Sequence, residues 1–327
     1  MKNKYMNPYV AGTMLGIVLL LAMFLAGRGL GASGGFKYCV VSIVGAVDHS
    51  HADKSIYYSK YFEGGKKPLK NWLTIEILGV IAGGFLSGAV SKRLKFKFFQ
   101  LPDLLQWLQF SVLHIYLHGS SGKTGYKMGP ISSLISMPEW LDLLIALMIG
   151  IGFGFSLEQA GFSSSRRLAG MFYGYDTTVI KVFFTAAIVA LVGSQFLSYF
   201  GLLNLNLVFV NEFYVNASII GGIIMGAGFI MGGFCPGTGL CALSIGKIDA
   251  MIFFLGGLAG AYLFAETYPF IQKLANDSYK GPVKINEIIG ISPGLFTFLL
   301  IIAAAAMFWL AEIAEKRFAR PDITNEI

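Results

Sequence analysis

Apolar runs close to 20 residues long recur along the chain, and they limit its possible folds more than any other feature. A helix needs about 20 residues to cross the hydrocarbon layer of a membrane. The sequence is 55% hydrophobic and 13% charged, whereas a soluble domain carries roughly a quarter charged residues. These values predict an all-α polytopic membrane protein.

The runs are of two lengths, and together they predict about seven full spans and three half-length pieces. The full spans are expected at 8–26, 71–90, 141–157, 177–200, 214–233, 250–264 and 291–314, and the half-length pieces at 36–47, 168–175 and 240–245. The pattern divides the chain into an N-terminal transmembrane unit (1–97), an interfacial segment and linker (98–127) and a C-terminal transmembrane unit (128–327).

Basic residues gather beside some of these runs. The densest cluster is 91–97, another follows the last span at 315–320, and the loop 201–213 has no Lys or Arg. Cytoplasmic loops carry an excess of Lys and Arg, so we expect 91–97 and the C-terminus on the cytoplasmic side of the inner (plasma) membrane. The net charge of +7 reflects this bias and not a surface for nucleic acid, which we do not expect as a partner.

Residues 48–70 are predicted to form a polar loop. Its two histidines, His49 and His51, fall short of a ligand set, so we expect no metal site. The chain also shows no nucleotide-binding motif. We therefore expect no cofactor.

The run that enters Cys235 is interrupted in an unusual way. Phe-Cys-Pro-Gly-Thr-Gly follows a glycine-rich apolar stretch, and a second short apolar run comes after it. Pro236 removes a backbone donor and disfavours helix at Cys235. Such a break is costly inside a membrane unless it lines a cavity or a binding site. The sequence therefore predicts a functional break that carries a thiol.

The break at Cys235 has a counterpart earlier in the chain. Gly-x-Gly-Phe occurs at 152–155 and again at 226–229, leading to Gly-Phe-Ser at Ser163 and to Gly-Phe-Cys at Cys235. A short apolar run, an aspartate and a long apolar span follow each. Recurrent spans with such breaks are typical of transporters whose binding site lies between repeats.

A half-length helix that begins inside a membrane is suited to binding an anion. Its first N–H groups have no partner within the helix, and its dipole places positive charge at the tip. The tip attracts an anion without a charged side chain. Two facing tips would form a constriction that favours small anions.

Three stretches resemble the YeeE/YedE family of sulfur-transport membrane proteins, which includes thiosulfate transporters. The glycine–cysteine pattern around Cys235 is the most specific of them, and the resemblance covers most of 5–97 and 128–312. The stretches are Gly-Arg-Gly-Leu-Gly-Ala-Ser-Gly at 27–34, Glu-Gln-Ala-Gly-Phe-Ser-Ser-Ser-Arg at 158–166 and Gly-Phe-Cys-Pro-Gly-Thr at 233–238.

The resemblance implies an hourglass-like bundle of inverted repeats, in which cysteines on re-entrant loops pass a sulfur-containing anion along by S–H···S contacts. Cys235 matches the cysteine of the family's glycine-rich loop. Ser163 stands where many members carry a cysteine, so this contact would be a hydroxyl here. The segment 98–127 lacks a further Gly-Cys loop. The chain thus resembles an abbreviated first unit joined to a complete second one.

Cys235 is the predicted centre of a substrate site that also includes Gly233, Pro236, Gly237 and Thr238. A thiol donates weakly to an anionic sulfur, whereas a thiolate would repel it. We therefore expect a neutral thiol that binds the anion and does not act as a nucleophile.

Further candidates lie outside this motif. Ser163 and Cys39 are each placed near a break, and Cys241 lies within the short apolar run, where packing is its expected role. Arg28 stands between two glycines after a full span. An arginine inside a membrane is functional unless it reaches the interface, and both interpretations of Arg28 stay open.

Two adjacent arginines follow the first break. Arg166 and Arg167 are interpreted as cytoplasmic anchors, and Glu158 is the nearest candidate counter-charge for them. We expect this to be a structural pair.

These observations predict a transporter, not an enzyme, that takes up a small sulfur-containing anion. Thiosulfate is the anion that the resemblance favours. The expected partners are the lipid bilayer and a cytoplasmic sulfur-carrier protein. A channel for another sulfur or selenium species is one alternative, and a membrane-embedded enzyme with a persulfide on Cys235 is another. The enzyme would require an activated thiolate and a nearby base, which the sequence does not reveal.

Overall fold

The computed structural model describes residues 5–63, 68–94, 130–134, 137–276, 279–282 and 284–318. Within these ranges the regular structure is helical, apart from an isolated β-bridge between Tyr214 and Tyr279. The predicted all-α polytopic architecture is confirmed. The helices are α1 (Pro8–Ala26), α2 (Ala32–Val47), α3 (His49–Lys54), α4 (Ser59–Phe62), α5 (Trp72–Val90), α7 (Ile131–Leu134), α8 (Glu139–Gln159), α9 (Ser165–Gly170), α10 (Thr178–Tyr199), α11 (Val215–Gly232), α12 (Pro236–Ser244), α13 (Ile248–Asn276), α14 (Ile285–Ile289) and α15 (Pro293–Arg317).

Seven stretches in this part of the chain are long and apolar enough to cross a membrane, as the sequence predicted. Six are single helices: α1, α5, α8, α10, α13 and α15. The seventh, Val215–Ser244, joins α11 to the half-length α12 across the break at Cys235. The chain is therefore a multi-pass membrane protein.

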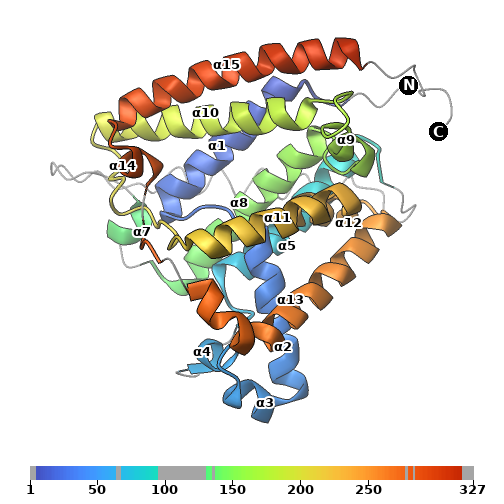
Figure 1. Ribbon diagram of the computed structural model, residues 1–327, viewed down its shortest axis with the longest axis vertical. Coiled ribbons are helices and arrows are strands. Elements are labelled where there is room, and N and C mark those ends of the chain that lie inside the picture. Colours follow the sequence, from blue (N-terminus) through green and yellow to red (C-terminus); the bar gives the residue numbers. More distant parts are fainter. Residues whose placement is uncertain are drawn as a thin grey trace.

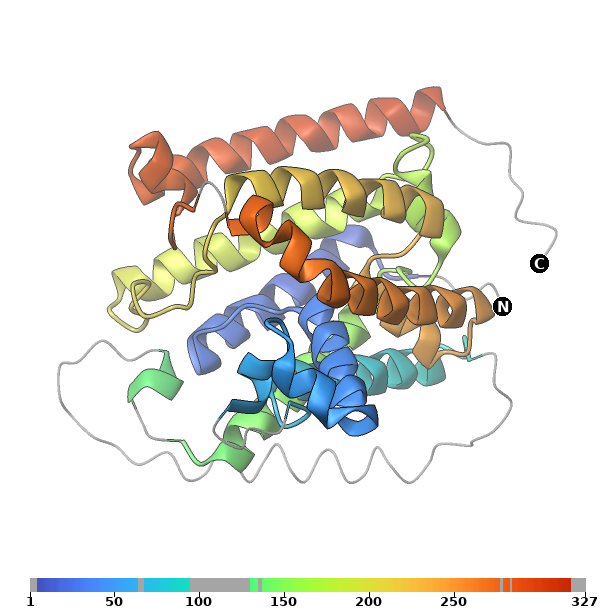
Figure 2. The ribbon, with the colours of Figure 1, turned by 60° about the horizontal axis from the view of Figure 1, so that its bottom comes forward.

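The long helices pack around α8 and around the two interruptions of the helices, which precede α9 and α12. In Figure 1, α15 runs alongside α10, and α10 alongside α1. Beneath them α8 packs against α1 and α5, while α11 and α13 extend from the two ends of α12. Figure 2 shows α2, α3 and α4 coming forward beside α13. The arrangement packs α12 against α2, α5, α8 and α13.

Several predicted boundaries are wrong. The half-length pieces expected at 168–175 and 240–245 are α9 (Ser165–Gly170) and α12 (Pro236–Ser244). The half-length helix expected to begin at Phe36 begins one turn earlier, because Gly34 and Gly35 let it lie close to side chains of α5. The loop expected over 48–70 contains α3 and α4. The span expected to end at Phe264 continues to Asn276 through Pro269, since contacts of Tyr58 hold this extension in place.

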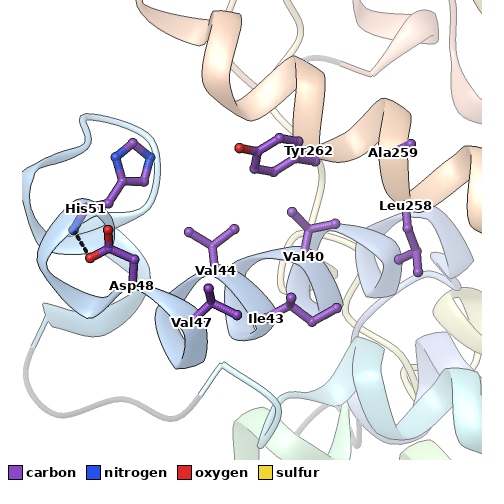
Figure 3. Close-up of a pocket in the computed structure, with 9 residues that line it drawn as sticks. All are labelled: Val40, Ile43, Val44, Val47, Asp48, His51, Leu258, Ala259 and Tyr262. Carbon is purple, nitrogen blue, oxygen red and sulfur yellow. Dashed lines mark hydrogen bonds between the residues drawn. The ribbon is translucent and has the colours of Figure 1, made fainter.

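A cluster of tyrosine side chains holds the extension of α13 and joins it to α2, α3 and α4. Tyr58 is fully buried and donates to Glu266 at 3.1 Å, and His51 pairs with the same carboxylate at 3.1 Å. Beside it a groove of about 510 Å³ runs between α2 and α13. Figure 3 shows Val40 and Val44 of α2 on the side of α2 that faces Tyr262 of α13. His51 is thus used in a structural contact.

Glycines bring α5 and α8 into backbone contact. A Cβ added at Gly83 would collide with the carbonyl oxygen of Ile151, and one at Gly154 with that of Val80. Small residues that let backbones approach closely are the usual means of packing helices in membranes. The α5–α8 pair is therefore held by direct backbone contact, and α12, which follows the break at Cys235, packs against both helices.

Gly154→Ala is expected to lower the free energy of unfolding by about 1–3 kcal/mol, because the added methyl has only backbone to meet. Gly260→Ala on α13 is the matched control, since its methyl meets nothing within 4 Å. Thermal unfolding of both variants in detergent checks the prediction. Equal melting temperatures for the two variants would contradict the close packing of α5 and α8.

Several predictions concern segments that lie wholly or partly outside the described residues. The basic cluster 91–97 is described only as far as Leu94, and the segment 98–127 lies outside the described residues. The basic end 315–320 is described as far as Phe318. The division into three parts at 97 and 127 stays a prediction.

Candidate functional site

The break between α11 and α12 is built by Gly233, Cys235 and Pro236. Gly233 ends α11 in the left-handed conformation with φ of 69°, which glycine adopts without strain. Cys235 is extended, at φ −92° and ψ 167°, as a residue before proline prefers. Pro236 is the first residue of α12, where its missing N–H leaves no bond unmade. The predicted interruption of the helix at Cys235 is confirmed, and its functional role stays a prediction.

Cys235 caps α12 with its thiol. Its Sγ accepts a hydrogen bond from the Thr238 N–H at 3.5 Å, while its own N–H donates to the Thr238 Oγ1 at 2.9 Å. This reciprocal pair is a capping box in which sulfur takes the place that serine or threonine usually fills. The sulfur of a half-buried thiol is thus fixed at the positive end of a helix dipole.

The capped thiol opens on an apolar pocket of about 530 Å³ between α9, α10, α11 and α13. Cys235, Pro236 and Thr238 form one side of it, and no charged side chain lines it among the described residues. The other lining residues are apolar, aromatic or glycine, among them Met171, Phe183, Met225, Phe229 and Phe253. An anion in this pocket would meet no cation among these lining residues, and the S–H of Cys235 is a donor that they offer.

Two other helix starts touch the same break. A Cβ built on Gly233 would lie 2.9 Å from the Cβ of Ser165, which begins α9. A Cβ built on Gly237 would lie 3.7 Å from the Cβ of Ala32, the first residue of α2. Three helix starts, those of α2, α9 and α12, are therefore gathered around Gly233 and Gly237.

Ser163 lies in the turn between α8 and α9. The residue is fully buried, and its hydroxyl has no hydrogen-bond partner among the described residues. Its neighbour Phe162 stacks on Phe183, which lines the Cys235 pocket. Ser163 itself is not a lining residue, although its hydroxyl is available as a donor.

The remaining predicted site residues lie away from this pocket. Cys241 is fully buried in α12, and its thiol donates to the Gly154 carbonyl at 3.6 Å. Cys39 is half-buried on α2. Arg28 is half-exposed, pairs with Asp142 at 3.6 Å and lies over the ring of Trp72. Roles for these three in substrate binding stay predictions.

The predicted pairing of Glu158 with Arg166 or Arg167 is wrong. Glu158 is paired with Arg93 at 2.7 Å, because the close contact of α5 and α8 brings the end of α5 to this carboxylate. Gly161, with φ of 84°, turns the chain so that Arg167 folds back. Arg167 then pairs with Asp176 at 3.3 Å.

Glu76 is a buried acid that the sequence reading passed over. It lies inside the α5 span, is 0% exposed, and accepts a hydrogen bond from the Gly31 N–H that precedes α2. A carboxylate within an apolar run was the signal available in the sequence, because an ionisable residue inside a membrane is a functional candidate by default.

A family model described as "Sulphur transport" matches residues 1–109 and 159–326. Comparison with the curated proteins and with the solved structures finds no match.

Proposed function

Because the chain belongs to the sulphur-transport family, and so is a sulfur transporter, we propose that it takes up thiosulfate across the inner membrane with Cys235 as the central contact. The observation that carries the proposal is the thiol fixed at the start of α12 and open to an uncharged pocket. In this proposal the break at Cys235 is the tip of a re-entrant element.

The donors around Cys235 suit an anion with a soft, polarisable sulfur. The sulfur of Cys235 already accepts from the Thr238 N–H, so its own S–H is free to donate to a ligand. Thioethers of Met171 and Met225 line the same pocket, and such sulfur atoms are polarisable. Thiosulfate offers a terminal sulfur to these groups, whereas sulfate offers only hard oxygen atoms.

The proposed orientation puts the start of α1 and the ends of α5 and α8 at the cytoplasm. These segments meet at one end of the bundle, where Met6 bonds to Gln159 and Arg93 to Glu158. Arg166 and Arg167 follow close by in the chain, so basic residues gather at this end. Ser163 and Cys39 are proposed as secondary contacts, and a cytoplasmic sulfur-carrier protein as the acceptor of the anion.

The test of substrate class is competition in cells that lack other routes of thiosulfate uptake and express this chain. Uptake of labelled thiosulfate is expected to fall with excess unlabelled thiosulfate and to persist with excess sulfate. Stronger competition by selenite than by thiosulfate would instead identify a channel for another species. A mass increase of about 32 Da on Cys235 after exposure would indicate persulfide chemistry and an enzyme.

A further inference from the structure

The buried carboxyl group of Glu76 has one oxygen atom that accepts no hydrogen bond of normal geometry from the described residues. Its Oε1 accepts the hydrogen bond from the Gly31 N–H at 3.2 Å. Its Oε2 accepts no hydrogen bond of normal geometry from the described residues, and the Trp72 indole N–H, which likewise has no such partner there, is a donor beside the carboxyl group. The side chain is 0% exposed, and no cation forms an ion pair with it in this part of the chain. An unpaired carboxylate buried in a membrane protein is costly, so the neutral acid is the form that this place favours.

Neighbouring charges do not compensate Glu76, because those on the helices packed against α5 have partners of their own. The titratable thiols on these helices are Cys39 on α2 and Cys235 and Cys241 at α12, and they are neutral when protonated. The charged neighbours and their partners are Asp142 with Arg28, Glu139 with Lys70, Glu158 with Arg93, and Lys37 with the rings of Tyr38 and Tyr61.

The carboxyl group of Glu76, which lies on α5, is also bonded to one of the helix starts that meet at the candidate site. Gly31 immediately precedes Ala32, so the carboxyl group is bonded to the start of α2. Ala32 in turn lies against Gly237 at the start of α12, beside Cys235. A charged Glu76 would repel an anion that approaches Cys235, because an apolar setting screens the charge poorly.

We propose that Glu76 is a proton-binding site that couples anion transport to proton movement. The inference rests on the proposed function as a thiosulfate transporter. Where the pH is high enough for Glu76 to be ionised before binding, a proton from water on the side of entry forms an O–H bond on its carboxylate as the anion binds near Cys235; at lower pH the neutral acid already carries that proton. The proton returns to water on the opposite side when the anion leaves. One proton thus accompanies each anion, and no oxidant or reductant is needed.

The first test measures proton uptake on binding by the purified wild-type protein in detergent. Titration calorimetry with thiosulfate in two buffers of different ionisation enthalpy is expected to give a proton uptake that rises toward one per anion as the pH is raised past the titration of Glu76, because only an ionised Glu76 has a proton to gain. The affinity is expected to fall about tenfold per pH unit above the titration of Glu76. Binding with neither proton uptake nor a change of affinity across this pH range would overturn the coupling and leave the proposed function intact, whereas no binding at all would remove both.

The second test compares Glu76→Gln with Glu139→Gln. Glutamine keeps the shape of Glu76 and is always neutral, so this variant is expected to bind thiosulfate with an affinity independent of pH and without proton uptake. Glu139 is an exposed acid at the start of α8, so its variant is expected to keep the wild-type pH dependence. Full pH dependence in a folded Glu76→Gln variant would overturn the proposal. If this variant does not fold, the wild-type proton count decides.

Discussion

Cys235→Ala is expected to reduce thiosulfate affinity by roughly 10–100-fold and to bring uptake close to the background. The variant loses the S–H donor to the anion, and a hydrogen bond to a charged group contributes about 1.5–3 kcal/mol. It also loses the sulfur that accepts from the Thr238 N–H. Binding to the purified protein and uptake by cells check the two parts of the prediction.

Cys235→Ser separates the cap from the ligand contact. Serine is a preferred N-cap residue, so this variant is expected to melt close to the wild type. Its uptake is expected to stay below that of the wild type, because oxygen is less polarisable than sulfur. Met231→Leu is the control for loss of a sulfur atom, since Met231 is 87% exposed and does not line the pocket. Wild-type uptake by a folded Cys235→Ala variant would refute the proposed role of the thiol.

Arg93→Ala is expected to cause the largest loss of stability, about 3–5 kcal/mol, because it leaves the buried Glu158 carboxylate without its counter-charge. The pair is bidentate, with Nε to Oε1 at 2.8 Å and Nη2 to Oε2 at 2.7 Å. Ser87 donates to the same carboxylate at 2.6 Å. The side chains of Arg93 and Glu158 are 8% and 0% exposed, so water cannot replace the lost partner. Thermal unfolding and the folded yield in detergent measure the effect.

The double variant Arg93→Met with Glu158→Leu tests the physical cause. Removing both charges avoids an unpaired ion, so most of the lost stability is expected to return. Lys70→Ala is the control, because its pair with Glu139 is largely exposed and such pairs contribute about 0–1 kcal/mol. A double variant as unstable as Arg93→Ala would show that packing, and not the uncompensated charge, causes the loss.

The spans were predictable because hydropathy is a local property of the sequence. An apolar run such as α1 must be buried in lipid or protein wherever it lies, and residue types alone identify it. The break at Cys235 was predictable for a similar reason, since Pro236 restricts its own backbone and that of the preceding residue.

The incorrect predictions have a different cause. Each concerns a feature that depends on contacts between segments far apart in the sequence. The continuation of α13 through Pro269 depends on Tyr58, which lies about 200 residues earlier and bonds to Glu266. The partner of Glu158 depends on the contact between α5 and α8, which is set by glycines on both helices. Sequence proximity favoured Arg166 and Arg167, but Arg167 folds back at Gly161 and pairs with Asp176 instead.

The candidate site was predictable only in part for the same reason. Cys235, Pro236 and Thr238 belong to one helix start and line the pocket, whereas Gly233 and Gly237 of the same motif are not among its lining residues. Cys241 lies in the same short helix, yet the rotation of the helix directs its thiol to Gly154 instead. Glu76 meets the start of α2 only because the chain returns along α5, which no local pattern reveals.

The most direct test of the central claim is exchange of labelled thiosulfate into liposomes that contain only the purified wild-type protein. Vesicles loaded with unlabelled thiosulfate are expected to accumulate the label well above protein-free vesicles, and vesicles with Cys235→Ala to stay near that background. Accumulation equal in all three preparations would contradict the claim that this chain transports thiosulfate through a contact with Cys235.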